Sequence, residues 1–448
     1  MLRSIWLLGV YVAFIALGTQ APFVLTLGYV WVDTFSPQLV SYIILNDIPV
    51  AMIMGALAVG AYLLLDRRAV PHLRAITVIQ LILAVWITLT SLWALFPEVA
   101  WGKWDWAFKT LLFSAFIPFV IRSRVQIEAF LQVYMLSLAA NLIPYGGKML
   151  LSGGGYGRDY GLVAGNSGLS EGSTLAAVSV MTIPFYLFLR RHSILAPKSV
   201  LVRQLYTGLA ILAGLTTLAT FERTGLVGLL TLGGALLLKS RRKVLTLIVG
   251  LIMAGLTTFV TSGAWTSRIS TIGQYQTEAS AYARILVWKW TLGFVQSYPL
   301  GGGFGTYLAD RIEFQDDSVR MGVAFHSVYF ELLGEQGWPG LAMFLSLAGF
   351  SLYGLQRSIR QARAYPELVW YRDLCSTLQV SLVILLVCGS FIGIAFQPMF
   401  HYLFALSASV AEYVRRVASG TSNELVGGRR PTLALATWRD RSQSSLTR

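Results

Sequence analysis

His326 is the side chain in this sequence best suited to move a proton. It lies in AFHSVYFELLGEQGWPG, at the end of a long polar segment, with Tyr329 one helical turn later and Glu331 and Glu335 beyond. An imidazole can take a proton from a hydroxyl group near neutral pH, which few side chains do unassisted. A lone histidine is more often structural than catalytic, but a place at the mouth of the membrane, beside arginines on the same side, favours a general base.

The other three histidines have weaker settings. His72 and His192 fall in basic loops between apolar segments, where we expect solvated side chains without a role. His401 begins the last apolar segment, and we expect it to pack against its neighbours.

Three arginines are candidates for binding an anion. Arg223 lies in FERTG between two apolar segments, Arg158 in the glycine-rich GGGYGRDYG, and Arg284 in AYARILVWKW, a pattern typical of a helix at the membrane surface. Guanidinium groups stay charged and bind phosphate oxygens in pairs, so several that converge suit a pyrophosphate. Any one of them could also be an ordinary interfacial side chain. For Arg223 we favour function, because a charge at the membrane mouth needs a partner or a task.

Two further patterns are weaker. Glu313, Asp316 and Asp317 could bind a hard divalent cation, but a solvated acidic patch is the commoner explanation, so we predict neither metal nor cofactor. LGGGFGTY has the glycines of a phosphate cradle but follows a helix and Pro299, not a buried strand, so it is not a P-loop. We expect a tight turn at 301–305 that brings backbone close to a ligand.

The elements that must position these groups are membrane helices. Of the 448 residues, 55% are hydrophobic and 12% charged, and the mean hydropathy is +0.63. That charged share is about half of what a soluble domain carries. Apolar segments near the length that a bilayer core of about 30 Å requires occur at 5–32, 48–65, 73–96, 106–121, 126–147, 173–189, 204–220, 225–239, 244–262, 339–356, 376–394 and 398–415. We expect Gly18 to Pro22 to break the first into two pieces.

The sequence therefore predicts an all-α polytopic membrane protein with about twelve transmembrane helices. Residues 1–262 would hold helices one to nine, and 263–338 a long periplasmic loop with short helices, one of them around 279–296. Residues 339–415 would hold helices ten to twelve, and 416–448 a disordered cytoplasmic tail.

The net charge of +14 is explained by topology. With the N-terminus inside, most of the 35 basic residues fall in segments that would face the cytoplasm, as the positive-inside rule requires. We therefore expect membrane lipids as surroundings and no nucleic-acid partner.

As a set, these motifs resemble a known family. The run R-x-x-x-W…P-x-G-G-G-F-G-T-Y, from Arg284 to Tyr307, and H-S-x-Y…E-x-G-x-x-G, from His326 to Gly340, resemble the O-antigen ligase and polymerase superfamily. FERTG stands where that family has Ser-Arg-x-Gly between two helices. The likeness covers about residues 170–400, and the N-terminal part, with Gly-Tyr-Val-Trp near residue 28, resembles exosortase-associated O-glycosylation ligases.

The resemblance implies a metal-independent, inverting glycosyltransferase of the GT-C type in the bacterial inner membrane. Such an O-antigen ligase takes a glycan from undecaprenyl pyrophosphate and passes it to a hydroxyl of lipid A–core on the periplasmic side, without a cofactor. His326 would be the general base, and Arg223 and Arg284 would bind the pyrophosphate and stabilise it as it leaves. Arg158 joins them without a motif of its own.

Two departures from the family pattern leave the substrates open. Ser327 replaces the asparagine after the histidine, and Glu222 replaces the serine before the arginine. An O-antigen polymerase and a protein O-oligosaccharyltransferase of the same superfamily remain alternatives. A transporter or flippase would show charges buried in mid-membrane and inverted repeats, and neither is clear in the sequence.

Overall fold

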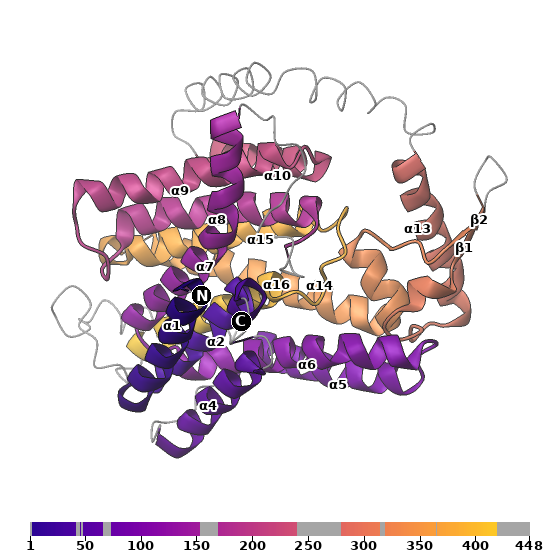
Figure 1. The fold of residues 1–448 in the computed structure, drawn as a ribbon, viewed down its shortest axis with the longest axis horizontal. Helices are drawn as coiled ribbons and strands as arrows, with labels where there is room; N and C mark the ends of the chain where they lie inside the picture. Colours follow the sequence, from indigo (N-terminus) through magenta and orange to yellow (C-terminus); the bar gives the residue numbers. More distant parts are fainter. Residues whose placement is uncertain are drawn as a thin grey trace, which may run out of the picture.

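The structure is mostly helical (Figure 1). It is a computed structural model that describes residues 2–41, 45, 48–65, 73–152, 169–239, 279–313, 319–363 and 365–418. The structure departs from the all-α expectation in one small sheet. Strands β1 (Arg311–Glu313) and β2 (Val319–Met321) form an antiparallel pair with Ile312 opposite Arg320.

Seven of the described helices are long and apolar enough to cross a membrane. They are α1 (Leu2–Gln20), α5 (Ala75–Leu92), α7 (Arg124–Ser152), α8 (Gly172–His192), α9 (Val200–Ala219), α14 (Val328–Ala362) and α15 (Val369–Cys388). Two apolar helices are shorter, α2 (Phe23–Phe35) and α4 (Val50–Leu65). The chain is therefore a multi-pass membrane protein, and the count of twelve crossings stays a prediction.

The remaining helical elements are shorter or more polar. They are α3 (Pro37–Val40), α6 (Pro97–Val120), α10 (Arg223–Lys239), α13 (Ala279–Ser297), η3 (Thr306–Ala309), η4 (Pro366–Leu368) and α16 (Pro398–Ala418). The expected helix at 244–262 and nearly all of the expected tail lie outside the described residues.

The predicted break in the first apolar segment is confirmed. Helix α1 ends at Gln20 and α2 begins at Phe23, with Pro22 between them. Proline lacks the N–H that would continue the helical hydrogen bonds. The two pieces differ in burial, because Trp6 of α1 is 65% exposed whereas Val30 of α2 is fully buried.

Helix α8 is the centre of the bundle and packs against α7, α9, α10 and α15. Small residues let helices approach closely in a membrane, and Gly225 of α10 shows this, since a β-carbon there would lie 3.2 Å from that of Ala176. Polar side chains also bond across helices, as when the Ser381 hydroxyl donates to the carbonyl of Met181.

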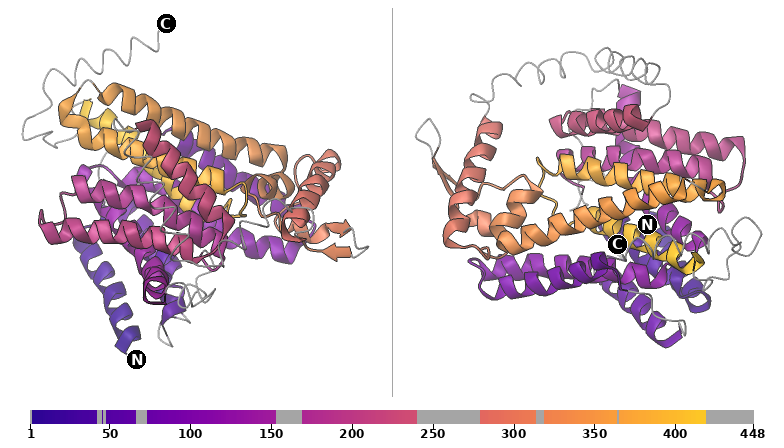
Figure 2. Two further views of the ribbon diagram at one scale, coloured as in Figure 1. Left: turned by 90° about the horizontal axis from the view of Figure 1, so that it is seen from above. Right: turned by 180° about the vertical axis from the view of Figure 1, so that it is seen from behind.

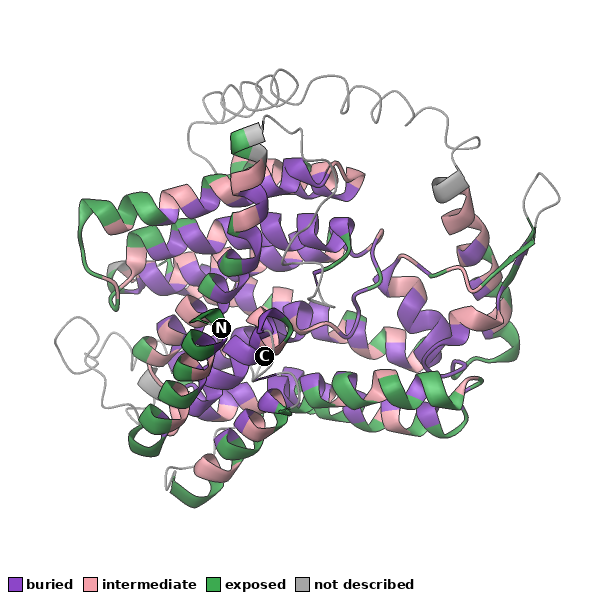
Figure 3. Cartoon of the chain, in the orientation of Figure 1, coloured by how far each residue is buried: buried purple, intermediate pink, exposed green. Residues whose placement is uncertain are grey.

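Exposed residues gather on the outer faces of α1, α4, α5 and α6 (Figure 3). On α5 many of them are apolar, because Ile82, Val85, Leu89 and Leu92 are all at least 40% exposed. Their helical spacing forms one stripe, which suits a surface in contact with lipid tails.

Helix α13 and the two strands lie together at one end of the bundle (Figures 1 and 2). The expected helix at 279–296 is thus confirmed as Ala279–Ser297. Helix α14 runs from Val328 to Ala362 and is broken at Gly337, whose φ is 66°. Its longer part begins close to 339, where the sequence predicted a membrane helix, and the part before the break is a short helix within the segment predicted as a loop with short helices.

Candidate active site

His326 lies immediately before α14 in a left-handed backbone conformation, with a φ of 46°. Residues other than glycine adopt this region rarely, so neighbouring contacts must hold it. The Trp288 indole N–H donates to the carbonyl of Phe325 at 2.8 Å, and the Val328 N–H donates to the carbonyl of Gly389 at 2.8 Å. The backbone around His326 is thus fixed from both sides, and 40% of the His326 side chain is exposed.

Glu171 faces the imidazole. Its Oε1 lies 3.7 Å from Nδ1 of His326, and its Oε2 accepts a hydrogen bond from the Thr174 hydroxyl at 3.1 Å. The distance to His326 exceeds that of a hydrogen bond and suits an ion pair once the imidazole has gained a proton. A carboxylate on this side favours the tautomer with the proton on Nδ1, which leaves Nε2 to accept a proton. Sequence reasoning missed Glu171; its only local signal was its place directly before an apolar helix.

Arg284 lies close enough to act on His326. Burial lowers the pKa of His326 below its usual value, the positive charge of Arg284 lowers it further, and the negative charge of Glu171 opposes them. On α13, Arg284 shares a face with Trp288, whose ring stacks on Phe330 at 5.0 Å. The imidazole is therefore neutral at pH 7, the form that accepts a proton.

Arg223 begins α10 at this same end of the bundle. The Ser173 hydroxyl at the start of α8 donates to Glu222 at 3.3 Å. On the other side, the Cys388 thiol lies 3.6 Å from the carbonyl of Thr224, and the next residue, Gly389, accepts the N–H of Val328, two residues after His326. The structure therefore gathers Arg223, Arg284 and His326 at one end of the molecule.

Three helices begin in this region: α8, α10 and α14. The first N–H groups of a helix have no partner within it, and the helix dipole makes this end positive, so helix N-termini attract anions. Glu171 and Glu222 oppose that charge, while Arg223 and Arg284 add to it. The arrangement suits an anionic group beside a proton acceptor.

Glu331 and Glu335 have a structural task that the sequence did not reveal. Both bind Lys103 of α6, whose Nζ lies 2.6 Å from Glu331 and 2.8 Å from Glu335. Glu331 also accepts the N–H of Ala395, and Glu335 that of Gly305. Because both carboxylates bind the same ammonium group, they fasten α14 to α6, and Glu335 also fastens α14 to the glycine turn.

The glycine turn packs against α14, and a close approach to a ligand stays a prediction. Gly301, Gly303 and Gly305 all have positive φ, and the N–H of Gly303 donates to the carbonyl of Glu335 at 2.9 Å. A β-carbon on Gly301 would lie 2.5 Å from that carbonyl, and one on Gly337 would lie 2.4 Å from the carbonyl of Pro299. The glycines of the two motifs therefore make room for each other's backbone.

Asp310 supports the segment that leads to His326. Its fully buried carboxylate accepts the N–H of Val323 at 3.1 Å, and burial raises its pKa. Nearby, Val287, Ile312 and Phe325 form a small apolar core of their own. This outer subdomain of α13, β1 and the loop thus holds the backbone around the imidazole.

The other candidate residues lie as follows. Arg158, Asp316, Asp317 and His72 lie outside the described residues, and among the described ones no group of three potential ligands could hold a metal ion. His192 is not solvated as expected, because its Nε2 lies 2.9 Å from Asp373 and its side chain is 11% exposed.

His401 does pack, fully buried, against the carbonyl of Ala395.

Comparison with known families adds to this geometry. Residues 2–194 match a family of unknown function, DUF5935, and residues 208–345 match the O-antigen ligase family, Wzy_C. No curated protein matches the chain. Arg223, Arg284, the glycine turn and His326 all fall within the second match. The match over residues 208–345 thus supports the resemblance of this part of the chain to the O-antigen ligase-like superfamily.

Proposed function

We propose that this protein is an O-antigen ligase of the bacterial inner membrane. It transfers a glycan from undecaprenyl pyrophosphate to a hydroxyl of lipid A–core on the periplasmic side. The observation that carries the proposal is the pairing of His326 with Glu171 beside Arg284, where His326 and Arg284 lie in the region that matches the ligase family.

In this proposal Nε2 of His326 takes the proton of the acceptor hydroxyl. The hydroxyl oxygen forms a bond to the anomeric carbon of the donor glycan, and the bond from that carbon to the pyrophosphate oxygen breaks. Attack from the face opposite the leaving group inverts the anomeric centre. Glu171 holds the imidazole and stabilises the positive charge that it gains.

Arg223 and Arg284 bind the pyrophosphate and stabilise the charge that develops as it leaves. The N-termini of α8 and α10 add to the positive potential there. Arg158 is included on the resemblance alone. Because these groups supply the positive charge, the mechanism uses no divalent cation.

A transfer assay tests the proposal. Purified protein receives one lipid-linked glycan donor together with lipid A–core, a second lipid-linked glycan or a protein acceptor, and the products are separated by size. We expect product on lipid A–core, undiminished by EDTA. Product on a lipid-linked glycan would show a polymerase, product on protein would show a protein ligase, and loss with EDTA that a divalent ion restores would refute the metal-free mechanism.

His326→Ala tests the base. It should lower transfer by about 10²- to 10⁴-fold, the usual contribution of a general base, while donor binding is retained. His192→Ala is the matched control and should stay active, because His192 ends α8 whereas Glu171 lies at the start of that helix. Transfer by His326→Ala at the normal rate would remove His326 from the mechanism.

A further inference from the structure

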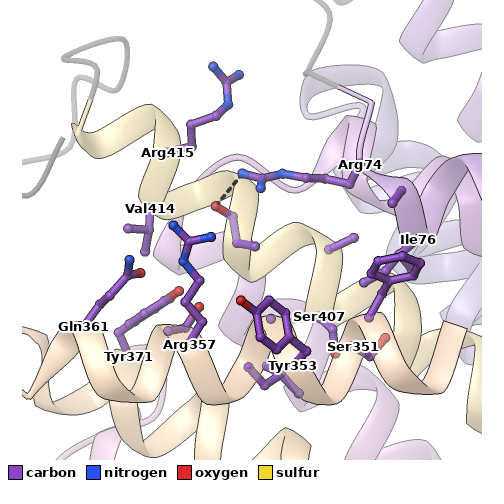
Figure 4. Close-up of a pocket in the computed structure, with 17 residues that line it drawn as sticks. Arg74, Ile76, Ser351, Tyr353, Arg357, Gln361, Tyr371, Ser407, Val414 and Arg415 are labelled. Atoms are coloured by element: carbon purple, nitrogen blue, oxygen red, sulfur yellow. Dashed lines mark hydrogen bonds between the residues drawn. The ribbon is translucent and has the colours of Figure 1, made fainter. Parts of the chain in front are cut away.

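A cavity of about 430 Å³ lies between α5, α14, α15 and α16, far from His326 (Figure 4). Arg357, which lines the cavity, lies about 30 Å along α14 from the kink at Gly337, at 1.5 Å per residue. That matches the thickness of the hydrocarbon core of a bilayer, about 30 Å. The cavity therefore lies at the opposite membrane face from the candidate active site, and the surrounding basic residues favour the cytoplasmic face.

The cavity carries more positive than negative charge. Arg74, Arg357 and Arg415 line it, and none of its lining residues is acidic. Arg74 reaches across to α16, donating to the carbonyl of Ala411 at 3.0 Å, whereas Arg415 points away (Figure 4). One carboxylate, that of Glu412, serves both Arg74 and Arg415. Arg357 extends from α14 toward α16 and brings the third charge to the cavity.

Two buried polar atoms in this cavity lack a hydrogen-bond partner among the described residues. They are the Ser351 hydroxyl oxygen and Nε of Arg74. Buried polar groups nearly always find a partner, so these two donors indicate an oxygen-rich ligand in the cavity. The hydroxyl and the guanidinium N–H can both donate to a phosphate oxygen.

The rest of the wall is apolar. The interior is lined by Ile76, Leu355 and Val414. The outer edge of the cavity is formed by Phe350 and Tyr353, which are 50% and 67% exposed. Aromatic side chains of this kind are typical of the membrane–water interface. A ligand that fits has an anionic head and a hydrocarbon tail.

We propose that this cavity binds an anionic phospholipid of the surrounding leaflet. Arg74 and Arg357 bind its phosphate, Ser351 donates to a phosphate oxygen, and an acyl chain follows Ile76 and Phe350. Basic cavities between membrane helices bind anionic lipid headgroups for the same reason. The site is separate from the proposed transfer reaction and does not depend on it.

Retention of added lipid tests the proposal. Full-length protein in detergent is incubated with phosphatidylglycerol or phosphatidylcholine, and bound lipid is counted by native mass spectrometry. We expect preferential retention of phosphatidylglycerol, reduced roughly fivefold by Arg357→Gln, the effect of one basic side chain near an anionic lipid. Arg360→Gln is the matched control, since Arg360 is an exposed arginine of the same helix outside the cavity.

A second pair of variants tests the space itself. A β-carbon on Gly354, which lines the cavity, would meet no atom within 4 Å, and the same holds for Gly349 on the same helix outside it. Gly354→Leu should displace the lipid, and Gly349→Leu should not. Equal retention of the two lipids, or normal retention by both Arg357→Gln and Gly354→Leu, would overturn the proposal. So would displacement of phosphatidylglycerol by inorganic phosphate at matched ionic strength, which would show a site for a free anion.

Discussion

The proton affinity of His326 is set by three neighbouring influences that act in opposite directions. Burial and Arg284 favour the neutral imidazole, and Glu171 favours the charged one. Their balance leaves the pKa below its usual value, so the neutral form persists to lower pH. In the proposed reaction, activity should therefore be lost only as the pH falls through that lowered value.

Substituting the two charged neighbours should move this acid limb in opposite directions. Glu171→Gln removes the influence that raises the pKa of His326, so the limb should shift to lower pH, with a lower plateau because the imidazole is no longer held. Arg284→Gln removes an influence that lowers the pKa, so the limb should shift to higher pH. The measurement is the pH profile of the transfer rate at saturating donor. Shifts in the same direction, or none, would show that these charges do not set the proton affinity of His326.

At the scale of elements, the start of α14 is fixed by contacts from distant parts of the chain. Lys103 fastens it to α6, and the glycine turn fastens it to the segment after α13. These two attachments determine where His326 lies, although neither reaches it.

Gly337→Ala should weaken the second attachment. A β-carbon at Gly337 would press on the carbonyl of Pro299, and its φ of 66° is unfavourable for alanine. We expect a loss of about 1–3 kcal/mol, measured by thermal denaturation in detergent. Gly349→Ala, which enters open space on the same helix, should be neutral or slightly stabilising. Equal effects of the two would contradict a packing role for Gly337.

Lys103→Met should be more damaging, because it leaves Glu331 and Glu335 buried without their cation. Breaking such a pair costs about 3–5 kcal/mol. Adding Glu335→Gln should recover part of the loss. Lys109→Met removes an exposed pair with Asp105 on the same helix, so it should cost less than about 1 kcal/mol. If both lysine variants unfold at the same temperature, the buried network does not hold α14 in place.

The existence of most helices followed from the sequence, while their ends and contacts did not. The helices α5, α8 and α9 could be predicted because their segments are apolar and long enough to span a bilayer. The part of α14 before Gly337 lies in the segment predicted as a loop with short helices, but the binding of Glu331 and Glu335 to Lys103 was not visible in the sequence. Likewise His326 and Arg284 could be singled out by type, but the partnership of His326 with Glu171 depends on how α8 meets α14.

At the scale of the whole molecule, the candidate active site and the basic cavity occupy opposite ends of α14. This polarity matches a chain whose positive charges lie mostly on one side of the membrane. The two faces should therefore differ in their accessibility from outside the cell.

Cysteine labelling tests that orientation. Both native cysteines are fully buried, so background labelling should be low. In cells with a permeable outer membrane, a membrane-impermeant maleimide should label Arg320→Cys, on the outer subdomain. It should label Lys198→Cys, in the α8–α9 loop, only after the inner membrane is opened. The reverse pattern would place the candidate active site in the cytoplasm and refute the proposed donor and acceptor.

The left-handed backbone at His326 offers a practical route to seeing both substrates in place. Asparagine and glycine tolerate this conformation better than other residues, so His326→Asn and His326→Gly should keep the surrounding loop while removing the base. Such proteins would be folded yet unable to turn over. They are therefore the natural choice for trapping donor and acceptor together for cryo-electron microscopy.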